Sequence, residues 1–136
     1  MTFNWTPEYS VRIAEIDAQH KKLFDLILKL EDCTRSPNFK AIVKDVLEDL
    51  MEYVNIHFET EEDYFRKAHY TDSKKHQAIH EEIKLNLNSK INDIFSRNVI
   101  ALDVIGLHNF LTNWLKNHIL EEDQQYVESL KKYHDL

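Results

Sequence analysis

The sequence predicts an all-α protein, an antiparallel up-down-up-down four-helix bundle preceded by an extended N-terminal arm. The 136 residues include one glycine and two prolines, which leaves little material for β-turns, while 43% of them are hydrophobic and 30% are charged. Apolar residues also recur at the 3,4 spacing of amphipathic helices in four segments that short polar breaks separate. A chain of this length is sufficient for one core, so we expect a single domain over residues 1–136.

The N-terminal arm is expected over residues 1–16, which show no helical periodicity and would lie extended across the hydrophobic surface of the bundle. The first helix is expected over residues 17–34, with Asp17 as its N-cap and His20 in its first turn. Its apolar positions follow the helical period and are Leu23, Phe24, Ile27 and Leu30.

The second helix is expected over residues 38–66, after the break that Pro37 introduces. Its buried stripe would consist of Ile42, Val46, Leu50, either Tyr53 or Val54, His57, Glu61, Tyr64 and Phe65. Glu61 is informative in this stripe, because an unpaired buried carboxylate is costly and normally has a partner or a metal ion.

The third helix is expected over residues 72–96, with His76 and His80 near its start. Its apolar stripe continues with Ile83, Leu87, Ile91 and Ile94. His57 with Glu61, and His76 with His80, are each four residues apart, so each pair lies on one helix face. This is the spacing of metal ligands.

The fourth helix is expected over residues 102–132, with Gly106 as a local weakness. Its apolar side would consist of Val104, Leu107, Leu111, Trp114, Leu115, His118, Tyr126 and Leu130. Asp123 follows His118 by five residues, and five residues of regular helix rotate the second side chain off the face of the first. We therefore expect either a local widening such as a π-bulge or an Asp123 side chain that leans across.

A candidate metal centre follows from the alternating direction of the four helices. It would gather seven side chains at one end of the bundle: His20, His57, Glu61, His76, His80, His118 and Asp123. Five imidazoles and two carboxylates are too many for one metal ion and suit two ions that the carboxylates bridge. This donor set, without thiolate, favours iron over zinc or manganese.

The alternative for each residue alone is an ordinary structural role. A single histidine on an apolar stripe is more often a hydrogen-bonded core residue, and Glu61 or Asp123 could pair with a lysine. Seven residues together at metal-ligand spacing favour the metal centre. We assign the other histidines, His69, His108 and His134, to the surface or to ordinary packing. Solvated faces are expected for Glu59, Glu62, Asp63, Glu121 and Glu122.

Four motif blocks, in order, resemble the signature of the hemerythrins in their single-domain bacterial form. They are Asp17-x-Gln19-His20, His57-Phe58-x-x-Glu61-Glu62, His76-x-x-x-His80 and Trp114-Leu115-x-x-His118-Ile119-x-x-x-Asp123-x-x-Tyr126. The resemblance implies one iron held by His76, His80 and His118 and a second held by His20 and His57. Glu61 and Asp123 would bridge both irons alongside an oxo or hydroxo group.

The function that the resemblance implies is reversible O2 binding at the iron with two histidines, for storage, delivery or sensing, without enzymatic activity. Candidates for an apolar wall around the oxygen are Phe24, Phe58, Trp114 and Ile119, although plain core packing explains them as well. Two alternatives stay open: a di-iron enzyme acting on peroxide or nitric oxide, and an iron reservoir. An oxygen-using enzyme is a conceivable recipient of the O2.

Composition excludes several other classes of protein. The formal net charge of −7 argues against a nucleic-acid-binding surface, and no apolar run approaches the roughly 20 residues of a membrane-spanning helix. Cys33 is the one cysteine and cannot form an internal disulfide. The lone cysteine and the lack of a signal-peptide pattern before residues 4–7 lead us to expect a cytoplasmic protein. We expect a monomer because the predicted helices leave no apolar surface stripe unexplained.

Overall fold

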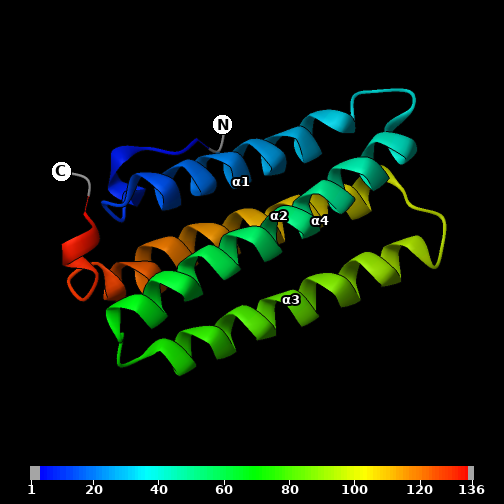
Figure 1. Cartoon of the computed structure of the whole chain (residues 1–136). Helices are drawn as coiled ribbons and strands as arrows, with labels where there is room; N and C mark the ends of the chain where they lie inside the picture. The colour runs from blue at the N-terminus through cyan, green and yellow to red at the C-terminus, as the bar shows by residue number, and fades with distance from the viewer. Residues whose placement is uncertain (1–3, 135–136) are drawn as a thin grey trace.

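Four antiparallel helices form the bundle in the computed structural model, which describes residues 4–134 (Figure 1). They are α1 (Ala14–Cys33), α2 (Phe39–Ala68), α3 (Ser73–Phe95) and α4 (Ala101–Asn117). Successive helices run in opposite directions, so the start of α1, the end of α2, the start of α3 and the end of α4 lie at one end of the bundle (Figure 1). The predicted up-down-up-down bundle is confirmed. Within residues 4–134, no helix combines the length and the hydrophobicity that crossing a membrane requires.

The N-terminal arm differs from the expectation in two respects. It is not extended throughout, because Pro7–Tyr9 form a short 3-10 helix, and α1 begins at Ala14, three residues earlier than expected. Asp17 is therefore not the N-cap, and that prediction was wrong. Its carboxylate instead accepts hydrogen bonds from Ser10 Oγ at 2.6 Å and from the Val11 backbone N–H at 2.8 Å. These contacts tie the arm to the first turn of α1. Because α1 begins at Ala14, His20 lies in its second turn and not in the first, as was expected.

A second hydrophobic cluster covers the end of the bundle where the arm lies. It combines arm residues with residues from α1, α2, the α2–α3 turn and the C-terminal segment: Val11, Ile13, Ile16, Phe65, Tyr70, Tyr126 and Leu130. The cluster closes this end of the bundle against water.

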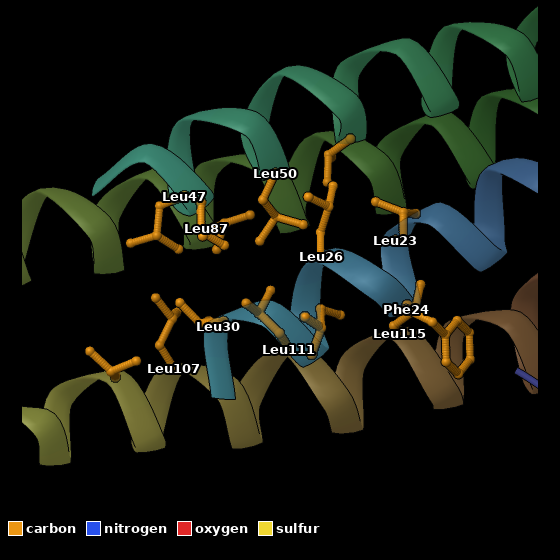
Figure 2. Packing of buried hydrophobic residues seen from close by; sticks show 14 of the residues in the cluster. Leu23, Phe24, Leu26, Leu30, Leu47, Leu50, Leu87, Leu107, Leu111 and Leu115 are labelled. Carbon is orange, nitrogen blue, oxygen red and sulfur yellow. The ribbon is translucent and has the colours of Figure 1, made fainter. Parts of the chain in front are cut away.

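Leucines are the commonest residues of the main core, and all four helices contribute them (Figure 2). On α2, Val43 is 1% exposed whereas Ile42 is 37% exposed, so the predicted burial of Ile42 was wrong. Of the two alternatives further along α2, Val54 is fully buried and Tyr53 is half-buried. The rotation of α2 about its own axis decides both positions, because the residue that faces the neighbouring helices α1 and α3 is buried and the residue beside it is not.

The fourth segment is not one regular helix to residue 132. Its α-helix ends at Asn117 and continues as a π-helix over His118–Glu122 and a 3-10 helix over Asp123–Tyr126. The widening expected between His118 and Asp123 is confirmed by this π-helix. Beyond it, residues 127–130 form turns and Lys131–Tyr133 form another 3-10 helix.

Candidate metal centre

All seven candidate ligands lie together at the end of the bundle that the arm covers. His20 comes from α1, His57 and Glu61 from α2, and His76 and His80 from α3. His118 is the first residue of the π-helix, and Asp123 directly follows that helix. Each of these side chains is at most 4% exposed. The arrangement brings together every metal ligand that the sequence predicted.

The π-helix explains how His118 and Asp123 meet although five residues separate them. A π turn holds more residues than an α turn, so it returns the fifth residue to the face of the first. Asp123 Oδ1 consequently lies 3.1 Å from His118 Nε2. A regular α-helix over the same residues would rotate the carboxylate away from the imidazole.

Two overlapping groups of donor atoms make up the centre. One consists of Glu61, His76, His80 and His118, and the other of His20, His57, Glu61 and Asp123; within each group the donor atoms lie within 4.8 Å of one another. The groups share Glu61. Each is therefore compact enough to hold one metal ion.

The two carboxylates lie between the groups. Asp123 directs Oδ1 to His76 and His118, at 3.0 and 3.1 Å from their Nε2 atoms, and Oδ2 to His20 at 3.2 Å. Glu61 Oε1 lies 3.1 Å from His80 Nε2 and 3.4 Å from His57 Nε2. Each carboxylate thus faces imidazoles from both sides of the centre.

The donor atoms of the centre are suited to a pair of metal ions, because they find no hydrogen-bond partners elsewhere in the described chain. The Nε2 atoms of all five histidines, Glu61 Oε1 and both carboxylate oxygens of Asp123 are buried and make no well-directed hydrogen bond within residues 4–134. Buried polar atoms without partners are rare and destabilising. Imidazole nitrogens and carboxylate oxygens without a thiolate are a suitable donor set for iron.

Burial and the mutual charges set the protonation of the metal-free site. Burial lowers the pKa of His57 to about 3, because the low-dielectric interior disfavours the cation. Burial and Asp123 would raise the pKa of Glu61, but the imidazoles of His57 and His80 outweigh them and lower it to about 2. The centre therefore presents a neutral His57 and an ionised Glu61, as metal binding requires.

His80 behaves differently. Burial lowers its pKa, but the adjacent carboxylates of Glu61 and Glu62 outweigh burial and raise it to about 9. His80 is consequently protonated at neutral pH in the absence of metal. A metal ion that binds its Nε2 atom must displace a proton.

Three residues that support the ligands were not recognised as such from the sequence. Gln19 Oε1 lies 2.8 Å from His57 Nδ1, Glu62 Oε2 lies 2.9 Å from His80 Nδ1, and the Tyr126 hydroxyl donates to Glu61 Oε2 at 2.6 Å. The prediction that Glu62 belongs to a solvated face was wrong, because its side chain is 26% exposed and is bonded to a candidate ligand. The sequence did contain a signal for two of these supporting residues, because Gln19 directly precedes the candidate ligand His20 and Glu62 directly follows the candidate ligand Glu61.

The four residues predicted to form an apolar wall are placed differently around the centre. Phe58 stacks on His80, with ring centroids 3.7 Å apart and planes at 4°, and Trp114 stacks on His118 at 5.0 Å and 19°. Ile119 lies within the π-helix and is fully buried. Phe24 is also buried and makes an edge contact with Tyr9 in the main core. Phe58 and Trp114 therefore contact candidate ligands directly.

Comparison with known proteins identifies the family. The chain matches the hemerythrin HHE cation binding domain over residues 11–130. The chain belongs to the hemerythrin family. The resemblance found in the sequence motifs is thereby confirmed. The seven candidate ligands, from His20 to Asp123, all lie within the matched residues of this hemerythrin domain.

Relatives from several organisms align over nearly the whole hemerythrin domain. A hemerythrin-like protein of Naegleria gruberi is 34% identical over 126 residues, which cover 91% of this chain and 90% of the relative. The bacteriohemerythrin of Methylococcus capsulatus is 31% identical and covers 90% of this chain and 92% of its own. A crystal structure of wild-type hemerythrin superimposes with a TM-score of 0.81 at 29% identity, over 93% of this chain and 96% of that chain.

Proposed function

We propose that this hemerythrin holds two iron ions and binds O2 reversibly. His76, His80 and His118 would hold one iron, and His20 and His57 would hold the other. Glu61 and Asp123 would bridge the two ions alongside an oxo or hydroxo group. The two overlapping groups of donor atoms and the position of both carboxylates between them support this assignment.

The observation that carries the proposal is the composition of the buried site, five imidazoles with two carboxylates, in a chain related to bacteriohemerythrins. An iron pair in this site supplies a position at which O2 binds. The iron position that has two histidines has fewer protein donors than its neighbour, so we assign O2 to that position.

The surrounding side chains exclude water and protect the site. Phe58 and Trp114 cover the imidazoles of His80 and His118, and Ile119, which follows His118 in the chain, is fully buried. Burial, together with Glu61 and Asp123, raises the pKa of Tyr126 well above its ordinary value of 10. The hydroxyl therefore keeps its proton and acts as a hydrogen-bond donor to Glu61. A buried site without an easily released proton favours reversible binding over cleavage of O2.

The test is the reaction of the iron-loaded, reduced protein with O2. We expect aerobically purified protein to contain about two irons per chain and to show charge-transfer bands of an oxo-bridged pair. Stopped-flow mixing of the reduced protein with O2 should give one fast binding phase and a much slower decay, and vacuum should release the O2. Rapid consumption of a supplied reductant over many cycles would favour an enzyme instead, and easy loss of iron to a weak chelator would favour a reservoir. The cytoplasmic location and the monomeric state stay predictions.

A further inference from the structure

Two of the candidate ligand histidines have hydrogen-bond partners of different chemistry. His57 Nδ1 faces the amide oxygen of Gln19 at 2.8 Å, whereas His80 Nδ1 faces the carboxylate of Glu62 at 2.9 Å. The two histidines belong to different groups of donor atoms within the centre. One metal position therefore has a ligand supported by a neutral group, and the other has a ligand supported by an anion.

The orientation of the Gln19 amide follows from its second contact. Its Nε2 donates to Thr60 Oγ1 at 3.0 Å, and Thr60 Oγ1 in turn donates to the Ile56 carbonyl oxygen at 3.0 Å. Because the amide nitrogen is engaged with Thr60, the amide oxygen faces His57 and accepts the Nδ1 proton. This contact directs the unprotonated Nε2 of His57 towards the centre.

Glu62 fixes the same tautomer at His80 in a different way. An ionised carboxylate can only accept, so His80 Nδ1 keeps its proton when a metal ion displaces the proton on Nε2, the atom that lies 3.1 Å from Glu61. An anionic acceptor pulls more strongly on the Nδ1 proton than an amide oxygen does, which makes the imidazole more basic at Nε2. His80 is consequently a stronger metal donor than His57.

We propose that Gln19 and Glu62 are positioning residues that make the two metal positions unequal, with Glu62 strengthening metal binding at the position of His76, His80 and His118. This inference rests on the proposed pair of metal ions. The neutral Gln19 leaves the neighbouring position, held by His20 and His57, with the weaker donors. Because its donors are weaker, the metal ion at that position binds the protein less firmly. It is also the position to which we assign O2, so it stays open to an external ligand.

Metal-stripped protein titrated with Co2+ tests the inference without O2 or iron. Competition with a chelator gives the affinity of each position, and the visible bands of Co2+ report its ligand environment. Glu62→Gln keeps an acceptor for His80 but removes its charge, Glu62→Ala removes both, and Gln19→Glu introduces a charge beside His57. Glu59→Gln is the matched control, because Glu59 lies less than one turn away on α2, is exposed and changes the net charge equally.

We expect Glu62→Gln to weaken one Co2+ position about 10-fold and to leave the other unchanged, with a larger loss in Glu62→Ala, since replacing such supporting partners costs about 10–100-fold in metal affinity. Gln19→Glu should tighten the other position and shift its bands. Glu59→Gln should change neither affinity. A loss of Co2+ affinity at one metal position alone would show that Glu62 acts through His80. A change in the net charge of the protein would instead affect both positions.

The inference is overturned if Glu62→Gln matches Glu59→Gln, or if both positions weaken equally. The inference is also overturned if Glu62→Gln binds Co2+ normally and only Glu62→Ala binds it weakly. In that case Glu62 would act by orienting His80, and its negative charge would contribute nothing. These results leave the proposed function intact as long as the wild-type protein takes up two ions. Uptake of fewer than two ions by the wild-type protein would contradict the proposed function itself, and the inference with it.

Discussion

The hydroxyl of Tyr126 donates a hydrogen bond to Glu61 Oε2 over 2.6 Å, and both side chains are fully buried. The contact joins the 3-10 helix after the π-helix to α2 across 65 positions of sequence. It also holds the Glu61 carboxylate with Oε1 towards His80 and His57. Tyr126 therefore helps to shape the centre before any metal binds.

Replacement of Tyr126 by phenylalanine should destabilise the metal-free protein by about 1.5–3 kcal/mol, because a buried hydrogen bond to a charged group is lost. The ring can stay packed on Phe65, whose centroid lies 5.1 Å away. Urea unfolding of the metal-free variant measures the loss. Tyr133→Phe is the control, since Tyr133 is half-buried near the C-terminus. Equal midpoints for the two variants would show that the hydroxyl of Tyr126 contributes nothing.

Removal of a bridging carboxylate should cost both irons, whereas removal of a histidine should cost mainly one. We expect Asp123→Ala to lower the iron content from about two per chain towards zero, because Asp123 faces histidines of both groups. His20→Ala should lower it towards one. Metal analysis of the purified variants decides, with Glu121→Ala as a control from the exposed side of the same π-helix. Two irons retained in Asp123→Ala would refute the bridging role.

Removal of the metal should lower the stability of the wild-type protein. The buried Nε2 atoms and carboxylate oxygens then lack partners, and each unsatisfied group costs on the order of 1–3 kcal/mol. Ligands that bind the native state alone also stabilise it by mass action. Thermal unfolding with and without bound metal should therefore show a melting temperature several degrees lower for the metal-free form. Coincident curves would contradict a buried metal centre.

The stability of the metal-free protein should be greatest near pH 6.5. The pKa of His57 is lowered from 6.5 to about 3 in the native state. Between pH 6.5 and about pH 3 the unfolded chain therefore binds a proton at His57 that the native state does not bind. The free energy of unfolding consequently falls as the pH drops below 6.5. Glu61, lowered from 4.5 to about 2, adds to the loss below pH 4.5. His80, raised from 6.5 to about 9, contributes stability below pH 6.5 that is lost as the pH rises towards 9.

Urea unfolding at intervals from pH 4 to 9 measures this profile. A single group changes stability by at most about 1.4 kcal/mol per pH unit. His57→Gln should flatten the acid side, whereas His69→Gln, at an exposed position, should not. An acid side that is equally steep in both variants would assign the loss to other groups.

Replacement of Gly106 by alanine should stabilise the protein by about 1 kcal/mol, because glycine is the weaker helix former in a helix interior. Gly106 lies within α4, and a Cβ atom added there meets no atom within 4 Å. Denaturant unfolding measures the gain. Iron content should stay the same, because the substitution lies three turns of α4 before His118. A loss of stability would show that the added methyl group is not accommodated.

The sequence by itself determined the fold and the set of residues that meet in the centre. Periodicity and ligand spacing are local properties of a helix, so the pairs His57–Glu61 and His76–His80 could be placed on helix faces directly. The short breaks between helices then required neighbours to run antiparallel, which brought all seven residues to one end. The spacing of His118 and Asp123 also indicated that a regular α-helix would not serve, and of the two alternatives, a local widening and a leaning Asp123, the structure contains the widening.

The tertiary structure decided which residues are buried and which side chains meet across segments, because both depend on how each helix is rotated and on which segments lie next to one another. The burial of Val43 in place of Ile42 follows from how α2 faces its neighbours. The bonds of Asp17 to Ser10 and Val11, which replaced the predicted N-cap, depend on the path of the arm. Periodicity describes one helix at a time and contains no information about such contacts. Gln19, Glu62 and Tyr126 stand in the sequence motifs, but each reaches a ligand on another segment, and that is why the structure was needed to show which ligand each one supports.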